Sequence, residues 1–118
     1  MKSMRVTKPH NPESPDVLTM RTGDTLRGEK RETVFEGWLW CTDESGTSAW
    51  IPEEYLTRLS KSGTYKALRD YTSFEMSVDI GQEVVIEYAA AGWAWVRTPD
   101  DREGWVPLEI LEEVDKVT

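Results

Sequence analysis

The stretch GWLWC at residues 37–41 is repeated 55 residues later as GWAWV at residues 92–96. At the same spacing, AWIP at residues 49–52 is repeated as GWVP at residues 104–107. All six tryptophans of the 118-residue chain lie in these four segments. Because chance similarity rarely reproduces three tryptophans, a glycine and a proline at one fixed spacing, the sequence indicates an internal duplication.

The two copies are joined by the segment SKSGT at residues 60–64, whose small and polar residues are typical of a linker. Each copy has the length of one small domain. The sequence therefore predicts two domains, residues 1–60 and residues 61–118.

Each copy contains short runs of aromatic and β-branched residues, such as 38–42 and 93–98, which are typical of strands. Turn-forming residues follow these runs at 43–46 and 98–101. Helical signals are limited to places such as residues 52–56, where a proline suits the start of one 3₁₀ turn. The pattern predicts an all-β chain made of two tandem small antiparallel barrels with about five strands each.

Side-chain alternation within the strands predicts which residues form the core. Leu39 and Cys41 point away from Trp38 and Trp40, because successive residues of a strand face opposite sides. We expect the aliphatic residues inside and the tryptophans outside; the alternatives are reversed faces, or tryptophans that cover the barrel edges. The residues expected in the core are Val6, Leu18, Leu26, Cys41, Ile51 and Leu56 in the first copy, and Ala67, Leu68, Met76, Val84, Val96, Val106 and Leu111 in the second.

The composition argues against several classes of function. With 14 Lys+Arg against 22 Asp+Glu the formal net charge is -8, which disfavours nucleic acid and anionic membranes as partners. Cys41 and His10 are the single cysteine and histidine, so neither an intrachain disulfide nor a zinc site is expected. The chain has no glycine-rich phosphate loop and no nucleophile elbow, so we expect neither enzyme activity nor a cofactor. The N-terminus has no apolar stretch behind its basic residues, and the expected location is the cytoplasm.

The second copy resembles the Src homology 3 family, whose small barrels bind proline-rich peptides. Its segment ALRDY at residues 67–71 is similar to the family's opening ALYDY, and EMSVDIGQ at residues 75–82 is similar to the ELSFxxGD that follows it. The tryptophan segments at 92–93 and 104–107 are similar to the family's later strands. More narrowly, the tandem arrangement resembles the variant Src homology 3 proteins of bacteria.

This resemblance implies a peptide-binding surface of aromatic residues in each copy. Such a surface suits an extended polyproline II segment, because the segment loses little entropy on binding and its ridges fit between flat rings. The expected partner is a protein or peptide with an extended segment, in the most specific hypothesis proline-rich with a basic residue. The residues assigned to peptide binding are His10, Trp38, Trp50, Pro52 and Tyr55 in the first copy, and Tyr71, Trp93, Trp105 and Pro107 in the second.

Both copies depart from the family pattern. The second has only four residues between Tyr71 and Met76, and it has Ile110 where the family has its last tyrosine. The first keeps a longer loop with Glu13 and Asp16, so it is predicted to be the main site and to select a basic residue in the ligand. Two other functions are left open, a structural or self-association unit whose tryptophan faces pack between the barrels, and a cell-wall-binding module.

Overall fold

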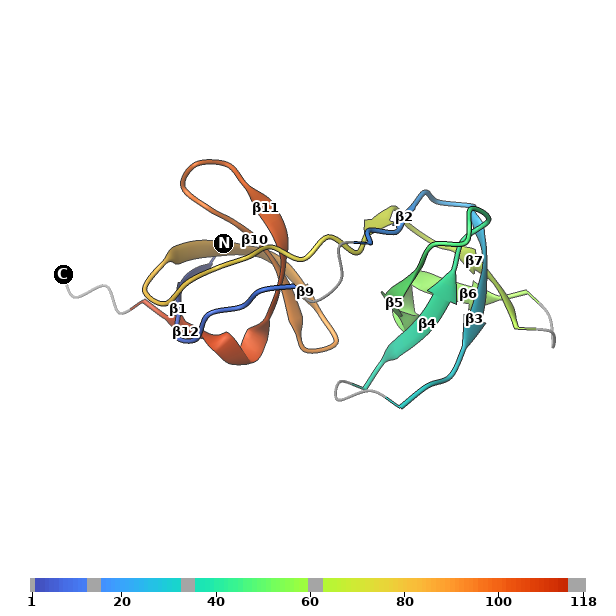
Figure 1. The fold of residues 1–118 in the computed structure, drawn as a ribbon, viewed down its shortest axis with the longest axis horizontal. Coiled ribbons are helices and arrows are strands. Elements are labelled where there is room, and N and C mark those ends of the chain that lie inside the picture. The colour runs from blue at the N-terminus through green and yellow to red at the C-terminus, as the bar shows by residue number, and fades with distance from the viewer. Residues whose placement is uncertain (1, 13–15, 33–35, 60–62, 115–118) are drawn as a thin grey trace. The chain divides into compact units, whose positions relative to one another are not determined.

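The computed structural model describes residues 2–12, 16–32, 36–59 and 63–114, and within them it places strands and short 3₁₀ helices (Figure 1). The strands are β1 (Lys2–Val6), β2 (Thr19–Met20), β3 (Thr25–Glu29), β4 (Trp38–Thr42), β5 (Ser48–Pro52), β6 (Leu56–Arg58), β7 (Thr64–Ala67), β8 (Tyr71–Thr72), β9 (Glu83–Ala90), β10 (Trp93–Arg97), β11 (Glu103–Pro107) and β12 (Leu111–Glu113). The 3₁₀ helices are η1 (Glu53–Tyr55) and η2 (Leu108–Ile110), as the prolines before them predicted. None of the described helices is long and apolar enough to cross a membrane.

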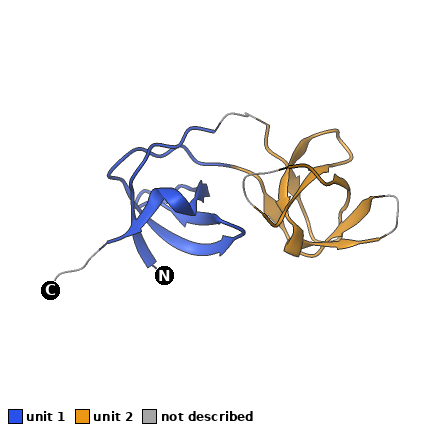
Figure 2. Cartoon of the chain, turned by 90° about the horizontal axis from the view of Figure 1, so that it is seen from below, with its two compact units in different colours: residues 1–13, 75–118 blue, residues 14–74 orange. Residues whose placement is uncertain are grey.

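The chain forms two compact units, and one of them is discontinuous in sequence (Figure 2). Unit 1 consists of residues 1–13 and 75–118, and unit 2 consists of residues 14–74. This division differs from the predicted contiguous domains, 1–60 and 61–118.

Unit 1 is built on an antiparallel sheet with the strand order β11-β10-β9-β1-β12. Strand β1 lies between β9 and β12, with Met4 opposite Val84 on one side and Val6 opposite Leu111 on the other. The first strand of the first sequence copy therefore completes the sheet of the second copy.

Unit 2 shows the reciprocal arrangement, in an antiparallel sheet with the order β5-β4-β3-β7-β6. Strand β7 pairs with β3 through Leu26 and Tyr65, and with β6 through Leu56 and Ala67. A separate two-stranded sheet joins β2 and β8. The two sequence copies have thus exchanged their first strands within one chain.

The short segment after β8 gives a physical reason for the exchange. In unit 2 the N–H of Ser73 donates to the carbonyl of Leu18, and Met76 is the counterpart of Leu18 in the second copy. If the second copy folded on itself, Ser73 would face Met76, and Phe74 and Glu75 would form the whole turn. Two-residue hairpin turns require left-handed backbone positions that favour glycine or asparagine, so this pair is poorly suited to the turn. In the structure the chain instead continues into unit 1.

The predictions of an all-β chain and antiparallel sheets are confirmed. The strand pairings among the described residues do not close either five-stranded sheet, and two tandem barrels are therefore not confirmed.

The predicted core is largely confirmed, but two of its members moved to the other unit. Val6 packs in the unit 1 cluster, and Ala67 lies in unit 2, because each is carried there by its exchanged strand. The prediction for Leu68 was wrong, because this side chain is 52% exposed beyond the end of β7, and Leu111 is only partly buried. The residues confirmed as buried are Val6, Leu18, Leu26, Cys41, Ile51, Leu56, Ala67, Met76, Val84, Val96 and Val106.

The tryptophan faces follow the predicted alternation only in part. Leu39 and Cys41 are buried at 2% and 0% exposure, as expected for the inner face. Trp38 and Trp105, expected outside, are also buried, at 8% and 2%. The prediction that the tryptophans lie on the outer side is therefore wrong for these two residues.

Candidate functional site

The predicted aromatic residues of unit 2 gather around η1. Tyr55 ends this 3₁₀ helix, which is held at the start of β4 because the N–H of Glu53 donates to the carbonyl of Gly37 at 2.8 Å. Trp38 is the first residue of β4, and it lies opposite Pro52 in the pairing of β4 with β5.

Tyr71 joins this group from the second sequence copy. Its ring meets the ring of Tyr55 edge-on, with 5.8 Å between the ring centroids and an interplanar angle of 68°. Its hydroxyl donates a hydrogen bond of 2.9 Å to the carbonyl oxygen of Trp50, and its backbone pairs with Met20. Two tyrosines from different copies therefore share one surface, and the position of Tyr71 is fixed by both its backbone and its hydroxyl.

Two charged residues flank the tyrosine pair. The guanidinium of Arg69 lies over the ring of Tyr55, 4.4 Å from its centroid. Burial raises the pKa of Tyr55, and the positive charge of Arg69 opposes that rise. The carboxylate of Asp70 accepts hydrogen bonds from the N–H and hydroxyl of Thr22, which hold the pKa of Asp70 below its ordinary value.

Strands β4 and β5 of unit 2 carry a second pair of aromatic rings. Trp40 and Trp50 lie opposite each other on β4 and β5, and their rings meet edge-on at 5.2 Å. Arg31 stacks over Trp40, 4.9 Å from its centroid. Both indoles are partly exposed, whereas the two tyrosines are buried.

The corresponding surface of unit 1 is less aromatic. His10 packs edge-on against Trp93 at 5.6 Å, and its Nε2 lies 2.9 Å from Oε1 of Glu75. Pro107 lies opposite Trp93 in the strand pairing, and Ile110 ends η2 where Tyr55 ends η1. The imidazole thus takes the place that Tyr71 holds in unit 2.

Unit 1 also has an aromatic cluster that the sequence analysis did not assign to a site. Tyr88 stacks on Trp95 at 6.1 Å, and both rings meet Trp105 edge-on, at 5.6 and 5.5 Å. Trp95 could have been identified from the sequence, because it repeats the position of Trp40. Tyr88 could not, because it lies outside the repeated motifs. Trp105 is only 2% exposed, so this cluster holds it inside the unit rather than presenting it to a ligand.

The exchange regroups the predicted site residues. His10, assigned to the first copy, lies in unit 1 with Trp93, Trp105 and Pro107. Tyr71, assigned to the second copy, lies in unit 2 with Trp38, Trp50, Pro52 and Tyr55. The acidic loop residue Glu13 lies outside the described residues, whereas Asp16 is described and exposed.

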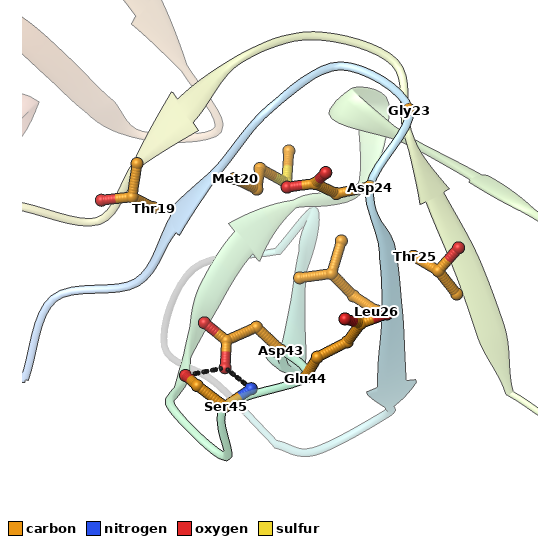
Figure 3. Close-up of a pocket in the computed structure, with 9 residues that line it drawn as sticks. All are labelled: Thr19, Met20, Gly23, Asp24, Thr25, Leu26, Asp43, Glu44 and Ser45. Carbon is orange, nitrogen blue, oxygen red and sulfur yellow. Dashed lines mark hydrogen bonds between the residues drawn. The ribbon is translucent and has the colours of Figure 1, made fainter.

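None of these aromatic residues lines the pocket of about 360 Å³ that unit 2 contains (Figure 3). Two of its three carboxylates already bond locally, since Asp43 accepts from the N–H groups of Ser45 and Thr47, and Asp24 accepts from the N–H of Arg21. Among the residues that the structure describes, no group of three or more histidines, cysteines and carboxylates could hold a metal ion. The pocket is lined by Thr19, Met20, Gly23, Asp24, Thr25, Leu26, Asp43, Glu44 and Ser45.

Comparison with known families gives one match. The family described as "Variant SH3 domain" matches residues 64–114. No curated protein matches the chain. The matched segment begins in β7, which lies in unit 2, and continues through unit 1, so one family-sized stretch of sequence contributes to both units. These findings support an SH3-like protein.

Proposed function

We propose that the chain is a non-catalytic, cytoplasmic protein-interaction module, and that the aromatic surface of unit 2 binds an extended segment of a partner protein. SH3-type domains commonly mediate protein–protein interaction. Each unit is, in this proposal, a barrel of this type whose first strand comes from the other sequence copy.

The observation that carries the proposal is the pairing of Tyr55 with Tyr71. The two rings meet at 5.8 Å, and Trp38 lies opposite Pro52 in the same unit, which gives unit 2 the aromatic set that unit 1 lacks. Flat rings held in fixed positions grip an extended segment at low entropic cost, because neither side needs much reordering. Unit 1, with His10 and Ile110 in the equivalent places, is assigned the weaker site.

The charged residues of unit 2 bear on the choice of ligand. Glu54 is exposed on η1 and acts electrostatically on Tyr55, and Asp16 is exposed on the segment before β2. In this proposal these carboxylates favour a lysine or arginine in the ligand, a role that the sequence analysis gave to Glu13 and Asp16, whereas Arg69 opposes one directly over the Tyr55 ring. A proline-containing segment with a basic residue at the Glu54 end fits both features. For a small surface of this kind we expect affinity on the order of micromolar or weaker.

The burial of the rings favours a second function. Trp38, Tyr55 and Tyr71 are 8%, 5% and 8% exposed, so they also act as packing residues. In this second proposal the aromatic surface is chiefly structural, and no peptide binds to it. Partial exposure of Trp40 and Trp50 keeps the binding function our first choice, because a ligand can reach these rings directly.

Chemical-shift mapping with basic proline-rich peptides tests the two functions against each other. Binding to unit 2 moves the signals of Trp50, Tyr55 and Tyr71, and Glu54→Gln weakens the binding while also reducing its dependence on salt. The matched control is Glu109→Gln on η2 of unit 1, which leaves binding unchanged. Shifts centred on Trp93 would assign the site to unit 1, and the absence of shifts at any tryptophan would favour the structural function.

A further inference from the structure

The N-terminal arm, residues 2–10, occupies a slot in unit 1 between β9 and β12. Its strand β1 hydrogen-bonds to both neighbours, and Met4 and Val6 point into the core at 7% and 1% exposure. Farther along, the N–H and carbonyl of His10 both bond to Val78, at 2.9 and 3.0 Å. Without the arm, β9 and β12 would each lose a strand neighbour and present unpaired backbone groups.

Charge complementarity makes this slot selective. Lys2 forms an ion pair with Glu113, and Arg5 lies 3.7 Å from Glu112 and 4.0 Å from Glu83. The arm supplies the cations and the strands on either side supply the carboxylates. A strand with basic residues at positions 2 and 5 and buried apolar residues at positions 4 and 6, as in β1, is therefore the occupant that the slot fits.

The arm is not directly connected along the chain to the rest of unit 1. The chain leaves unit 1 after residue 13, forms the whole of unit 2, and returns at residue 75. The hydrogen bonds and ion pairs of the arm described above are all made with residues 75–114. An identical arm delivered by another chain can make the same contacts, because none of them depends on which molecule the arm belongs to.

We propose that the slot between β9 and β12 is a docking site for the N-terminal arm of a second copy of this chain. Two chains that donate their arms to each other form a closed, two-fold dimer in which every unit 1 is complete. In the wild type, the chain's own arm competes at an effective concentration on the order of millimolar, so at micromolar protein the monomer predominates. The exchange between chains becomes dominant when the chain's own arm is disabled.

Complementation between two full-length variants tests the proposal. Val6→Asp disables the arm and leaves the slot intact, whereas Val84→Asp disables the slot and leaves the arm intact. Each variant alone loses the folded NMR signals of Trp93, Trp95 and Trp105. Mixing equal amounts restores these signals in one chain of each pair, to half the wild-type intensity, and gives a species of twice the 13.6 kDa chain mass. The matched control is Val84→Asp mixed with Val106→Asp, two changes on the slot side, which restores nothing.

A peptide provides an independent readout. A synthetic peptide of residues 1–12, added in excess to the Val6→Asp variant, restores its unit 1 signals, and the same peptide with Arg5→Glu restores them at least tenfold less well. Retention of the unit 1 signals by Val6→Asp alone would overturn the proposal, because the arm would then not be needed there. The proposal would also be overturned if unit 1 stayed unfolded both in the mixture of variants and in the peptide titration.

Discussion

The contact between Tyr55 and Tyr71 provides the most direct test of the exchanged fold. The two residues belong to different sequence copies, yet their rings lie 5.8 Å apart at 68°. Edge-to-face pairs of this kind are worth about 0.5–1.5 kcal/mol beyond the area they bury. We therefore predict that Tyr55→Leu and Tyr71→Leu are not additive, and that their coupling free energy lies in that range.

The single variants have separable costs. Tyr71→Phe removes only the hydroxyl that donates to the carbonyl of Trp50 at 2.9 Å, and it should lower the free energy of unfolding by about 1 kcal/mol. Tyr71→Leu removes this hydrogen bond and the ring contact together, so we expect a loss of about 2 kcal/mol.

Urea unfolding of the wild type, the single variants and the double variant supplies the coupling, with unchanged denaturant slopes as the check on two-state behaviour. Ile110 is the matched control, because in a contiguous second copy it would take the place of Tyr55 next to Tyr71. In the exchanged fold Tyr71→Leu and Ile110→Ala lie in different units, and their effects should add to within about 0.5 kcal/mol. The exchange would be refuted if the effects of the two tyrosine variants on the free energy of unfolding were additive while those of Tyr71→Leu and Ile110→Ala were coupled.

Three further predictions follow from packing in the two cores. Burial raises the pKa of Cys41 to about 12, above its value of 9.0 in the unfolded chain, so its contribution to stability is complete below pH 9 and declines between pH 9 and 12. Cys41→Val should flatten that part of the pH profile of the unfolding free energy, and the native thiol should resist alkylation at pH 8. A Cβ on Gly28 would lie 2.5 Å from Cδ2 of Leu39 and 2.8 Å from the ring of Tyr65 on the exchanged strand β7, so Gly28→Val should lower the free energy of unfolding in urea by about 1–3 kcal/mol. Val106→Asp places an unpaired charge at a site with 0% exposure and should cost about 3 kcal/mol or more, and a wild-type melting curve would contradict its inward orientation.

Local features of the sequence were sufficient to predict the elements. The repeated tryptophan segments became β4, β5, β10 and β11, and the prolines that follow them lead into η1 and η2. The alternation in β4 correctly placed Leu39 and Cys41 in the core. These predictions succeed because strand periodicity and proline geometry act over a few residues and do not depend on which strand becomes the neighbour.

Strand assignment was the part that local patterns could not supply. Residues 64–67 offer the same apolar face to either five-stranded sheet. The match to the variant SH3 family, at residues 64–114, also groups these residues with the second copy. The available signal was the length of the segment after Tyr71, which leaves Phe74 and Glu75 as the only turn residues. The shortness of this loop was predicted from the sequence, but the chain path that follows from it was not.

The exchange also determines how the two copies diverge as candidate binding surfaces. With contiguous copies, Tyr55 would share a surface with His10, and Tyr71 with Ile110, giving two incomplete aromatic sets. Exchange of the first strands instead brings both tyrosines into unit 2 and leaves His10 beside Trp93 in unit 1. The short turn that disfavours folding of the second copy on itself therefore also favours the more aromatic surface. Changes at residues 72–75 should consequently affect ligand binding in unit 2 although they lie outside the aromatic residues themselves, because they govern which unit receives Tyr71.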